Sequence, residues 1–386
     1  MNTYHSANNK LRIAFCGTRG VPANYGGFET AVDEISRRFV QQGYSVDVFC
    51  RLSHSRETLN EHEGRRLITV KGAAHRSLET FVSAIQTGWF LFRHRREYSH
   101  IVWFNNANFP GILLTLLAGI PVTVNTDGLE WRRKKWRWPF KLYYVLTSFL
   151  IARICPTLIS DSRAIQKIFR EKYGRQTLFI PYGIPSPAEV TREEQDKILR
   201  EYGLSEGKYF LQITRLEPDN LPLEAAQGFI KSQLNNNGFD FLIVGYKDQT
   251  PYALELKNLS DKKGVRVFPA VYDPRVLYTL RTNCYAYVHG NSVGGTNPAL
   301  LEAMATCPRI LAINSEFSLE LLGDLGFLFV PAKIDEAFLK APDLEDIRNQ
   351  LSARVNANYN WDAVSKAYMA IIEGTATEYN PFGTSF

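Results

Sequence analysis

The stretch that decides the fold reads His289-Gly-Asn-Ser-Val-Gly-Gly-Thr-Asn-Pro-Ala-Leu-Leu-Glu302. The β-branched and aromatic run before it, residues 284–288, predicts a buried strand, and residues 298–305 predict a helix. Glycines at the join let the backbone approach a ligand with no Cβ atom in the way. Asn297 is a good N-cap and Pro298 suits the first helical position. Free N–H groups at such a helix start attract anions, so the stretch predicts a site that suits a diphosphate.

Glu302 lies four residues after Pro298, which places both on one face of the predicted helix and the carboxylate near the glycine loop. There it could accept hydrogen bonds from a pair of sugar hydroxyls. The alternative interpretation is a capped core helix that carries a surface glutamate, and the local sequence does not separate the two.

The whole run, HGNSVGGTNPALLEAM, resembles the HGxSVGGTNPxLLEAM-like segment of retaining GT-B glycosyltransferases of the family-4 kind, and within them of bacterial rhamnosyltransferases of surface-polysaccharide biosynthesis. The resemblance implies an α/β fold of two Rossmann-like domains facing a central cleft, with a C-terminal helix that crosses back to the first domain. It implies an acceptor-binding domain over residues 1–185, a nucleotide-sugar-binding domain over 186–360, and the crossover helix and tail over 361–386.

Composition agrees with an ordinary globular protein, since 386 residues with 45% hydrophobic and 22% charged side chains suffice for two cores. The longest uncharged apolar run, residues 112–124, is shorter than the roughly 20 residues that span a bilayer. The polar N-terminus lacks a signal-peptide pattern, so we expect a cytoplasmic protein. The five cysteines show no metal-ligand spacing and are predicted to be reduced and mostly buried.

A second glycine loop, residues 17–27, follows a predicted strand at 11–16 and precedes a predicted helix at 28–40. Its G-x-x-G spacing differs from that of dinucleotide enzymes, which argues against a nicotinamide oxidoreductase. The loop resembles the GTRGVPxxYGGFET-like run of the glycosyltransferases. The resemblance implies that backbone N–H groups of Gly26 and Gly27 bind the sugar and phosphate end of the donor, and that Tyr25 contacts the acceptor. A tight turn explains two glycines without this role.

Asp127 and Glu130 come directly after the predicted strand 121–125, at the edge of a parallel sheet where open α/β folds bind ligands. We expect them to bind acceptor hydroxyls, and one could help to deprotonate the attacking oxygen. An Asp-Gly turn before a helix is the alternative. The segment resembles the DGLEWRRxKW-like run of the family, which implies that Arg132 and Arg133 bind the acceptor too, including a lipid-linked pyrophosphate.

Residues 131–141 hold six basic side chains, no acidic ones and three of the six tryptophans, and a strongly apolar run follows at 142–154. Cations with tryptophans predict an interfacial element on the inner face of the membrane, because each cation near an anionic surface contributes about 1 kcal/mol. Two alternatives compete. We expect most of the apolar run to be core, and the basic run could bind nucleic acid, although no known nucleic-acid module surrounds it.

Arg215 follows the predicted strand 209–214 and could clamp a phosphate with its guanidinium fork, unless it is a surface arginine. The family carries a lysine five residues later, where this chain has Asn220. That departure leaves one cation at the donor diphosphate, unless Lys247 supplies a second. The resemblance also implies that backbone groups near Ala270 and Val271 read the nucleotide base.

The broad family has a glutamate eight residues before Glu302, where this chain has Gly294, and the rhamnosyltransferase-like subgroup shares that glycine. Thr296 and Asn297, with Gly295 beside them, are the expected replacements at the transferred sugar, which favours dTDP-L-rhamnose as donor.

The implied mechanism is transfer with retention, without a covalent protein nucleophile. The chain contains no Asp-x-Asp, so N–H groups and arginine are expected to do the work of a metal. The residues predicted to carry the reaction are Asp127, Arg215 and Glu302. Two alternatives stay open: a GT-B nucleotide-sugar epimerase and a non-catalytic protein that binds nucleotide sugars.

Overall fold

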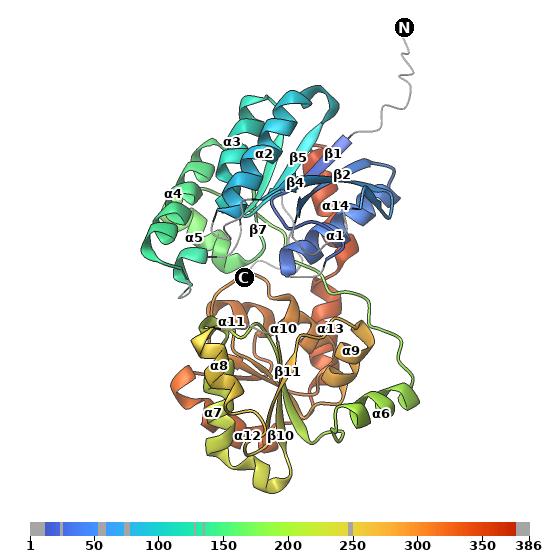
Figure 1. Cartoon of the computed structure of the whole chain (residues 1–386), viewed down its shortest axis with the longest axis vertical. Coiled ribbons are helices and arrows are strands. Elements are labelled where there is room, and N and C mark those ends of the chain that lie inside the picture. Colours follow the sequence, from blue (N-terminus) through green and yellow to red (C-terminus); the bar gives the residue numbers. More distant parts are fainter. Residues whose placement is uncertain are drawn as a thin grey trace. The chain divides into compact units, whose positions relative to one another are not determined.

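The computed structural model describes residues 12–23, 26–52, 59–72, 78–126, 129–133, 136–245 and 250–375. The chain forms two compact units. Unit 1 comprises Met1–Trp131, Trp138–Tyr182 and Trp361–Phe386, and unit 2 comprises Arg132–Arg137 and Gly183–Asn360. Each unit is built around one sheet with helices packed on it (Figure 1).

The sheet of unit 1 has the strand order β3-β4-β2-β1-β5-β6-β7-β8 and is parallel except for the short β3. Its strands are β1 Arg12–Cys16, β2 Ser45–Leu52, β3 Glu61–His62, β4 Arg65–Lys71, β5 His100–Phe104, β6 Val122–Thr126, β7 Thr157–Ser160 and β8 Leu178–Phe179. Its helices are α1 Gly27–Gln41, α2 Glu79–Arg93, α3 Phe109–Leu117, α4 Trp138–Ile154, α5 Arg163–Tyr173 and α14 Trp361–Ile372.

The sheet of unit 2 is entirely parallel, in the order β11-β10-β9-β12-β13-β14. Its strands are β9 Tyr209–Ile213, β10 Asp240–Gly245, β11 Val265–Pro269, β12 Ala286–His289, β13 Ile310–Ile313 and β14 Phe327–Phe329. Its helices are α6 Arg192–Glu201, α7 Pro222–Ser232, α8 Pro251–Lys257, α9 Pro274–Thr282, α10 Pro298–Thr306, α11 Glu316–Leu322, α12 Ile334–Lys340 and α13 Arg348–Asn358.

The central strands are buried on both faces, as the continuous apolar runs of parallel sheets predict. In β1, Ile13 and Phe15 pack in the same core as α1 and α14. On the opposite face Trp103 of β5 meets α3, where its indole N–H donates to Thr115 at 3.3 Å. The two units are therefore doubly wound, with helices on both faces of each sheet (Figure 1).

The C-terminal helix returns to unit 1, as expected. Trp361 of α14 is 2% exposed and stacks on Tyr182 with ring centroids 6.1 Å apart. The buried Tyr368 hydroxyl accepts a hydrogen bond from the Asn125 amide at 2.8 Å. Apolar burial and this one polar contact thus fasten the last helix to the sheet that contains the first strand.

The expectation that residues 142–154 are mostly core is wrong. α4 begins earlier, at Trp138, and buries only Tyr144, Thr147, Ser148, Ile151 and Ala152. The Thr147 and Ser148 hydroxyls donate to the Tyr144 carbonyl, and the Ser148 hydroxyl also accepts a hydrogen bond from the buried Asn106 amide at 3.1 Å. Three of the five buried side chains are therefore short, while Trp138, Leu142, Leu146, Phe149 and Ile154 are exposed. None of the helices in the described part of the chain is long and apolar enough to cross a membrane.

Replacement of Trp361 by alanine tests how much α14 contributes to unit 1. Removal of a buried indole should lower the free energy of unfolding by about 3–5 kcal/mol, because it leaves a cavity under the helix. Urea unfolding followed by circular dichroism measures the loss. Lys366→Ala, on the exposed side of the same helix, is the control and should change stability by less than about 0.5 kcal/mol. Equal small effects of both variants would show that α14 is only loosely attached.

Candidate functional site

A pocket lies in unit 2 at the carboxyl end of β12, between the loop that follows this strand and α11. β9 is flanked by β10 on one side and β12 on the other, so the loops after β9 and β12 leave the sheet at its topological switch point. Open α/β sheets bind ligands at this place. The pocket has about 210 Å³ of empty space, part of it open to solvent, and is lined by His289, Asn291, Val293, Gly294, Gly295, Asn297, Leu300, Phe317, Ser318 and Leu321.

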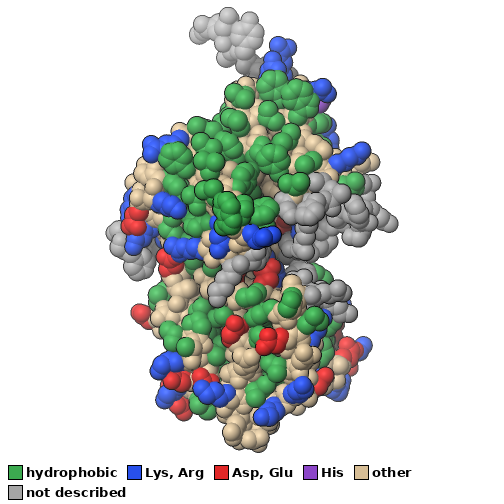
Figure 2. Space-filling model, turned by 60° about the vertical axis from the view of Figure 1, so that its left-hand side comes forward, with side chains coloured by type: hydrophobic (Ala, Val, Ile, Leu, Met, Phe, Trp, Pro, Cys, Tyr) green, Lys and Arg blue, Asp and Glu red, His purple; other side chains and the backbone are tan. Residues whose placement is uncertain are grey.

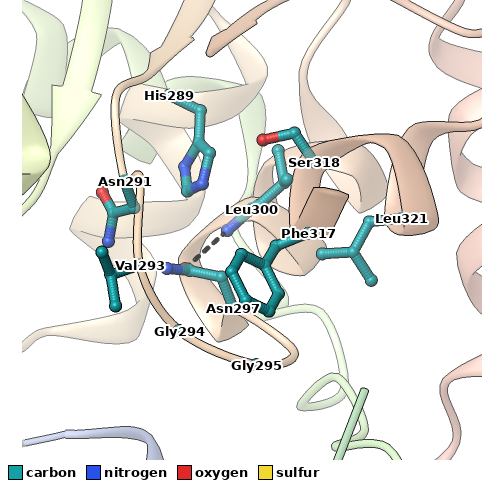
Figure 3. Close-up of a pocket in the computed structure, with 10 residues that line it drawn as sticks. All are labelled: His289, Asn291, Val293, Gly294, Gly295, Asn297, Leu300, Phe317, Ser318 and Leu321. Atoms are coloured by element: carbon teal, nitrogen blue, oxygen red, sulfur yellow. Dashed lines mark hydrogen bonds between the residues drawn. The ribbon is translucent and has the colours of Figure 1, made fainter. Parts of the chain in front are cut away.

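Figure 3 shows how two helices and one loop form its walls. His289 and Asn291 come from the end of β12, and the chain then passes Gly294 and Gly295 before α10 begins. The opposite wall is made by side chains of α11, among them Phe317. The glycine loop thus exposes its backbone to the pocket on one side.

The start of α10 offers fewer free donors than expected. The Asn297 side chain caps the helix by accepting hydrogen bonds from the amides of Ala299 at 3.0 Å and Leu300 at 3.3 Å. Pro298 has no N–H. The expectation that free helix-end N–H groups bind an anion is therefore wrong for these positions, because the cap already uses them.

The unpartnered backbone N–H groups lie instead in the glycine loop that precedes the helix. Within the described chain, the amides of Val293, Gly294 and Gly295 have no hydrogen-bond partner. A Cβ added at Gly294 would meet no atom within 4 Å, so the space beside this residue is open. Three consecutive unpartnered amides next to a helix N-terminus are donors of the kind that bind anions. Thr296, which follows them, is buried.

His289 is a neutral group in this pocket. Burial lowers the pKa of its imidazole to about 3, and its side chain is 3% exposed. The ring is therefore uncharged at neutral pH and cannot supply a cation for a phosphate. It can donate or accept a hydrogen bond, depending on its tautomer.

Two contacts attach the β12 loop to η4 (Pro218–Asn220), the turn that follows β9. The Ser292 amide and hydroxyl both donate to the Asp219 carbonyl, at 3.0 and 2.9 Å. Gly290 lies so close to this turn that a Cβ there would be 2.3 Å from the Asn220 carbonyl oxygen. A side chain at position 290 would therefore push the two loops apart.

Asn220 shapes this turn from inside. Its amide donates to the Arg215 carbonyl at 2.9 Å, and the residue is 1% exposed. Direct contact of Asn220 with a nucleotide-sugar donor therefore stays a prediction. Arg215 is partly exposed and lies 3.8 Å from Glu217, a carboxylate that sequence analysis did not weigh.

Glu302 is held by a partner that sequence analysis missed. Its carboxylate forms an ion pair with Arg281 of α9, whose side chain is only 8% exposed. Glu302 is not among the residues that line the pocket, so the pair directs the carboxylate toward α9. Arg281 lies in the last turn of α9, the helix that precedes β12. A basic residue at this place in the sequence was a weak signal that could have indicated the pair.

The structure places the remaining predicted residues of unit 2 at the sheet edge. Ala270 and Val271 lie, partly exposed, in the connection between β11 and α9. Phe317, Ser318 and Leu321 were missed. The Asn-Ser pair that follows strand β13 could have indicated them, because Ser315 caps α11 by accepting from the Ser318 amide.

In unit 1, Gly26 precedes α1 with an extended backbone and Gly27 is its first residue. The glycine loop before them closes over Glu29, which is buried and accepts a hydrogen bond from the Arg19 amide at 3.0 Å. Asn108, after β5, donates to the Gly17 carbonyl at 3.0 Å. The loop after β1 is thus positioned by its own helix and by the neighbouring strand.

Of the predicted acceptor residues, Tyr25 and Asp127 lie outside the described residues, as does Lys247. Glu130 and Arg133 are nearly buried, at 8% and 9% exposed. Their burial leaves little side-chain surface for an acceptor.

Arg132 is exposed and forms an ion pair with Glu316 at 2.6 Å. Both residues belong to unit 2. A role of Arg132 toward an acceptor therefore requires the release of this partner.

A family model described as a domain of unknown function (DUF1972) matches residues 11–185. No curated protein matches the chain.

Solved structures match it over nearly its whole length. A glycosyltransferase from Rickettsia africae is 16% identical with a TM-score of 0.71, over 95% of this chain and 99% of that one. Sucrose-phosphate synthase from Thermosynechococcus elongatus is 15% identical with a TM-score of 0.73, over the same shares. Anabaena HepE, solved with UDP and glucose, is 16% identical with a TM-score of 0.72, over 94% of this chain and 100% of that one. The chain has the GT-B fold. At these identities, the likeness establishes the fold and leaves the reaction to the site.

The neutral state of His289 predicts a pH-dependent stability. Its pKa is about 3 when folded and about 6.5 when unfolded, so the unfolded state binds a proton that the folded state does not. Stability therefore falls as the pH drops from about 6 to 4, by about 1.4 kcal/mol per pH unit. His289→Gln should remove this contribution and flatten the slope, as measured by urea unfolding at several pH values. Burial also lowers the pKa of His100 to about 4. His100 contributes equally to the pH dependence of stability in the wild type and in the His289→Gln variant. An unchanged slope would contradict the prediction.

A double-mutant cycle tests the ion pair that holds Glu302. Arg281→Met and Glu302→Gln should each destabilise unit 2, and their effects should be non-additive by about 1–2 kcal/mol, because either change already breaks the pair. Urea unfolding of the wild type, both single variants and the double variant gives the coupling energy. Additive effects would mean that the two side chains do not interact in solution.

Proposed function

We propose that this protein is a glycosyltransferase that moves a hexose from a nucleotide-diphosphate donor to a saccharide acceptor with retention of configuration. The observation that carries the proposal is the switch point of unit 2, where three unpartnered amides, a helix N-terminus and Arg215 follow two neighbouring strands. This combination supplies positive potential to a diphosphate without a metal. Proteins of similar fold include HepE, which was solved in complex with UDP-glucose.

In this proposal the diphosphate binds the amides of Val293, Gly294 and Gly295 and the guanidinium of Arg215. Arg281 holds the Glu302 carboxylate in place. The carboxylate lone pairs that Arg281 does not use accept hydrogen bonds from sugar hydroxyls of the donor. The backbone at Ala270 and Val271 reads the base. Unit 2 is thus the donor-binding unit.

The proposed donor is dTDP-L-rhamnose. Gly294 stands where the broader family carries a glutamate toward the transferred sugar, and the open space beside its Cα suits a sugar that makes no contact with a carboxylate. Thr296 and Asn297 are proposed to contact the transferred sugar in place of that glutamate.

The acceptor is proposed to be a lipid-linked saccharide that binds Tyr25, Asp127, Glu130, Arg132 and Arg133, and Gly26 and Gly27 are proposed to bind the donor. The acceptor oxygen forms a bond to the anomeric carbon on the face from which the diphosphate leaves, and the carbon–oxygen bond to phosphate breaks. The hydroxyl proton passes to the departing phosphate oxygen or to Asp127. Arg215 and the loop amides stabilise the charge on the leaving group.

Nucleoside-diphosphate release tests the proposal. The protein is offered dTDP-rhamnose, UDP-glucose, UDP-galactose, UDP-N-acetylglucosamine and GDP-mannose, each with and without a lipid-pyrophosphate-sugar acceptor. We expect acceptor-dependent release from dTDP-rhamnose and retained configuration in the product. Arg215→Met should lower kcat/KM by about 100-fold or more, the scale observed when one charge-stabilising donor is removed from an active site.

Arg192→Met, an exposed arginine at the start of α6, is the matched control and should leave kcat/KM unchanged. Conversion of the donor without acceptor would instead identify an epimerase. Binding of donors with no turnover under any condition would identify a non-catalytic nucleotide-sugar-binding protein. Acceptor-dependent release from one of the other donors alone would change the proposed identity of the transferred sugar and would still support the transfer reaction.

A further inference from the structure

Three helices of unit 1 turn their small side chains inward and their large apolar side chains outward. The buried residues of α2 are Ser83, Ala84, Thr87, Gly88 and Leu91, four of them small. α3 buries Gly111, Ile112 and Thr115, and α4 likewise buries mostly short side chains. A surface helix of a globular protein normally has the opposite pattern.

The small residues serve close packing between α2 and α3. A Cβ added at Gly88 would lie 2.8 Å from the Gly111 Cα, and one added at Gly111 would lie 2.4 Å from the Ala84 carbonyl oxygen. The two helix backbones therefore approach each other directly. The large side chains have no place in this contact and remain on the outside.

Eleven of the eighteen large apolar side chains that are exposed in the described chain gather on this part of unit 1. Figure 2 shows apolar side chains concentrated over these helices, with Lys and Arg side chains along the border. We call this surface the apolar face; it consists of Leu78, Phe81, Ile85, Trp89, Leu113, Leu117, Trp138, Leu142, Leu146, Phe149 and Ile154. Contiguous exposed apolar surface of this kind marks an interaction site.

The net charge of the chain is concentrated in the stretch of sequence that contains these helices, with five of its cations in residues 132–137, which belong to unit 2. Residues 78–154 contain ten Lys and Arg against four Asp and Glu, an excess of six that equals the net charge of the entire chain. The remainder of the sequence is therefore balanced, with 35 of each sign. The segments of α3 and α4 contain no acidic residue at all.

Cations lie directly beside exposed rings at the helix ends. The Arg93 guanidinium is 5.1 Å from the centroid of Trp89, and that of Arg153 is 5.2 Å from Phe149. Trp89 and Trp138 are 48% and 74% exposed. Indoles and cations at the margin of an apolar surface match the boundary between acyl chains and anionic head groups.

We propose that the apolar face docks on an anionic lipid bilayer, with the outward stripes of α2, α3 and α4 inserted at the level of the head groups. This extends the membrane contact beyond residues 131–141 to three helices and makes it depend on apolar insertion as well as on charge. A second copy of the chain fits less well, because a two-fold symmetric contact would bring the same cationic border against itself.

Vesicle flotation of the full chain tests the proposal. We expect binding to vesicles of phosphatidylcholine with phosphatidylglycerol, weaker binding to phosphatidylcholine alone, and release as salt rises. The triple variant Leu117→Gln, Leu142→Gln and Leu146→Gln should reduce binding by about ten-fold or more, since it removes apolar area from two of the three stripes. These side chains are 51–67% exposed, so the variant should remain folded.

The matched control is Leu254→Gln, Leu319→Gln and Leu339→Gln in unit 2, where the leucines are 45–54% exposed. It should bind vesicles like the wild type. Equal binding of both triple variants, or no binding of the wild type, overturns the proposal. Self-association in analytical ultracentrifugation that only the first variant abolishes, with no vesicle binding, would assign the face to a second copy.

Quenching of tryptophan fluorescence by bromine-labelled lipids measures insertion. Trp89→Phe and Trp138→Phe should each remove part of the quenching, whereas Trp103 and Trp361 are buried and should not be reached. Quenching that is as strong in the double variant as in the wild type would contradict insertion through these helices, because Trp131 and Trp136 can account for only part of it. The proposal deepens the proposed function by naming how unit 1 reaches a lipid-linked acceptor. Because vesicle binding is measured without donor or acceptor, its failure and a failure of sugar transfer are separate results.

Discussion

The close approach of Gly290 to the carbonyl of Asn220 is the constraint on which the candidate site depends. It brings the loop after β12 against the turn after β9, and the two hydrogen bonds from Ser292 to the Asp219 carbonyl hold it there. Because these loops touch, the turn that contains Asp219 and Asn220 lies beside the loop that contains the three free amides. The parallel sheet makes the contact possible, because neighbouring strands end at the same edge.

In these loops, the N–H groups available to a ligand are those that have no hydrogen-bond acceptor within the protein. Asn297 caps α10 so completely that the helix offers its dipole but not the amides of its first turn. The glycine loop provides donors instead, since Val293, Gly294 and Gly295 have no internal partners in the described structure. Helix capping and unpartnered amide donors are therefore divided between two adjacent segments.

Unit 1 shows a different use of small residues. Where Gly290 allows two loops to meet, Gly88 and Gly111 allow two helices to meet, and the consequence is a surface rather than a pocket. Large apolar side chains that a conventional helix would bury are displaced outward. Hydrophobic periodicity alone does not determine which face of a helix is buried, because the same stripe pattern fits a helix with either face toward the sheet.

The doubly wound fold and the return of the helix at Trp361 were implied by the family resemblance, whereas the sequence by itself determined the alternation of strands and helices and the bounds of most of those near the glycine loops. These features depend on local periodicity, capping and glycine chemistry, which short segments carry. Only the tertiary structure decided that Arg281 holds Glu302, that Asn220 points into its own turn and that α4 exposes its leucines. The first depends on a contact between two different helices and the last on which face a helix presents, and neither is encoded in local spacing. The Asn220 contact is a hydrogen bond across five residues, whose direction local periodicity does not specify.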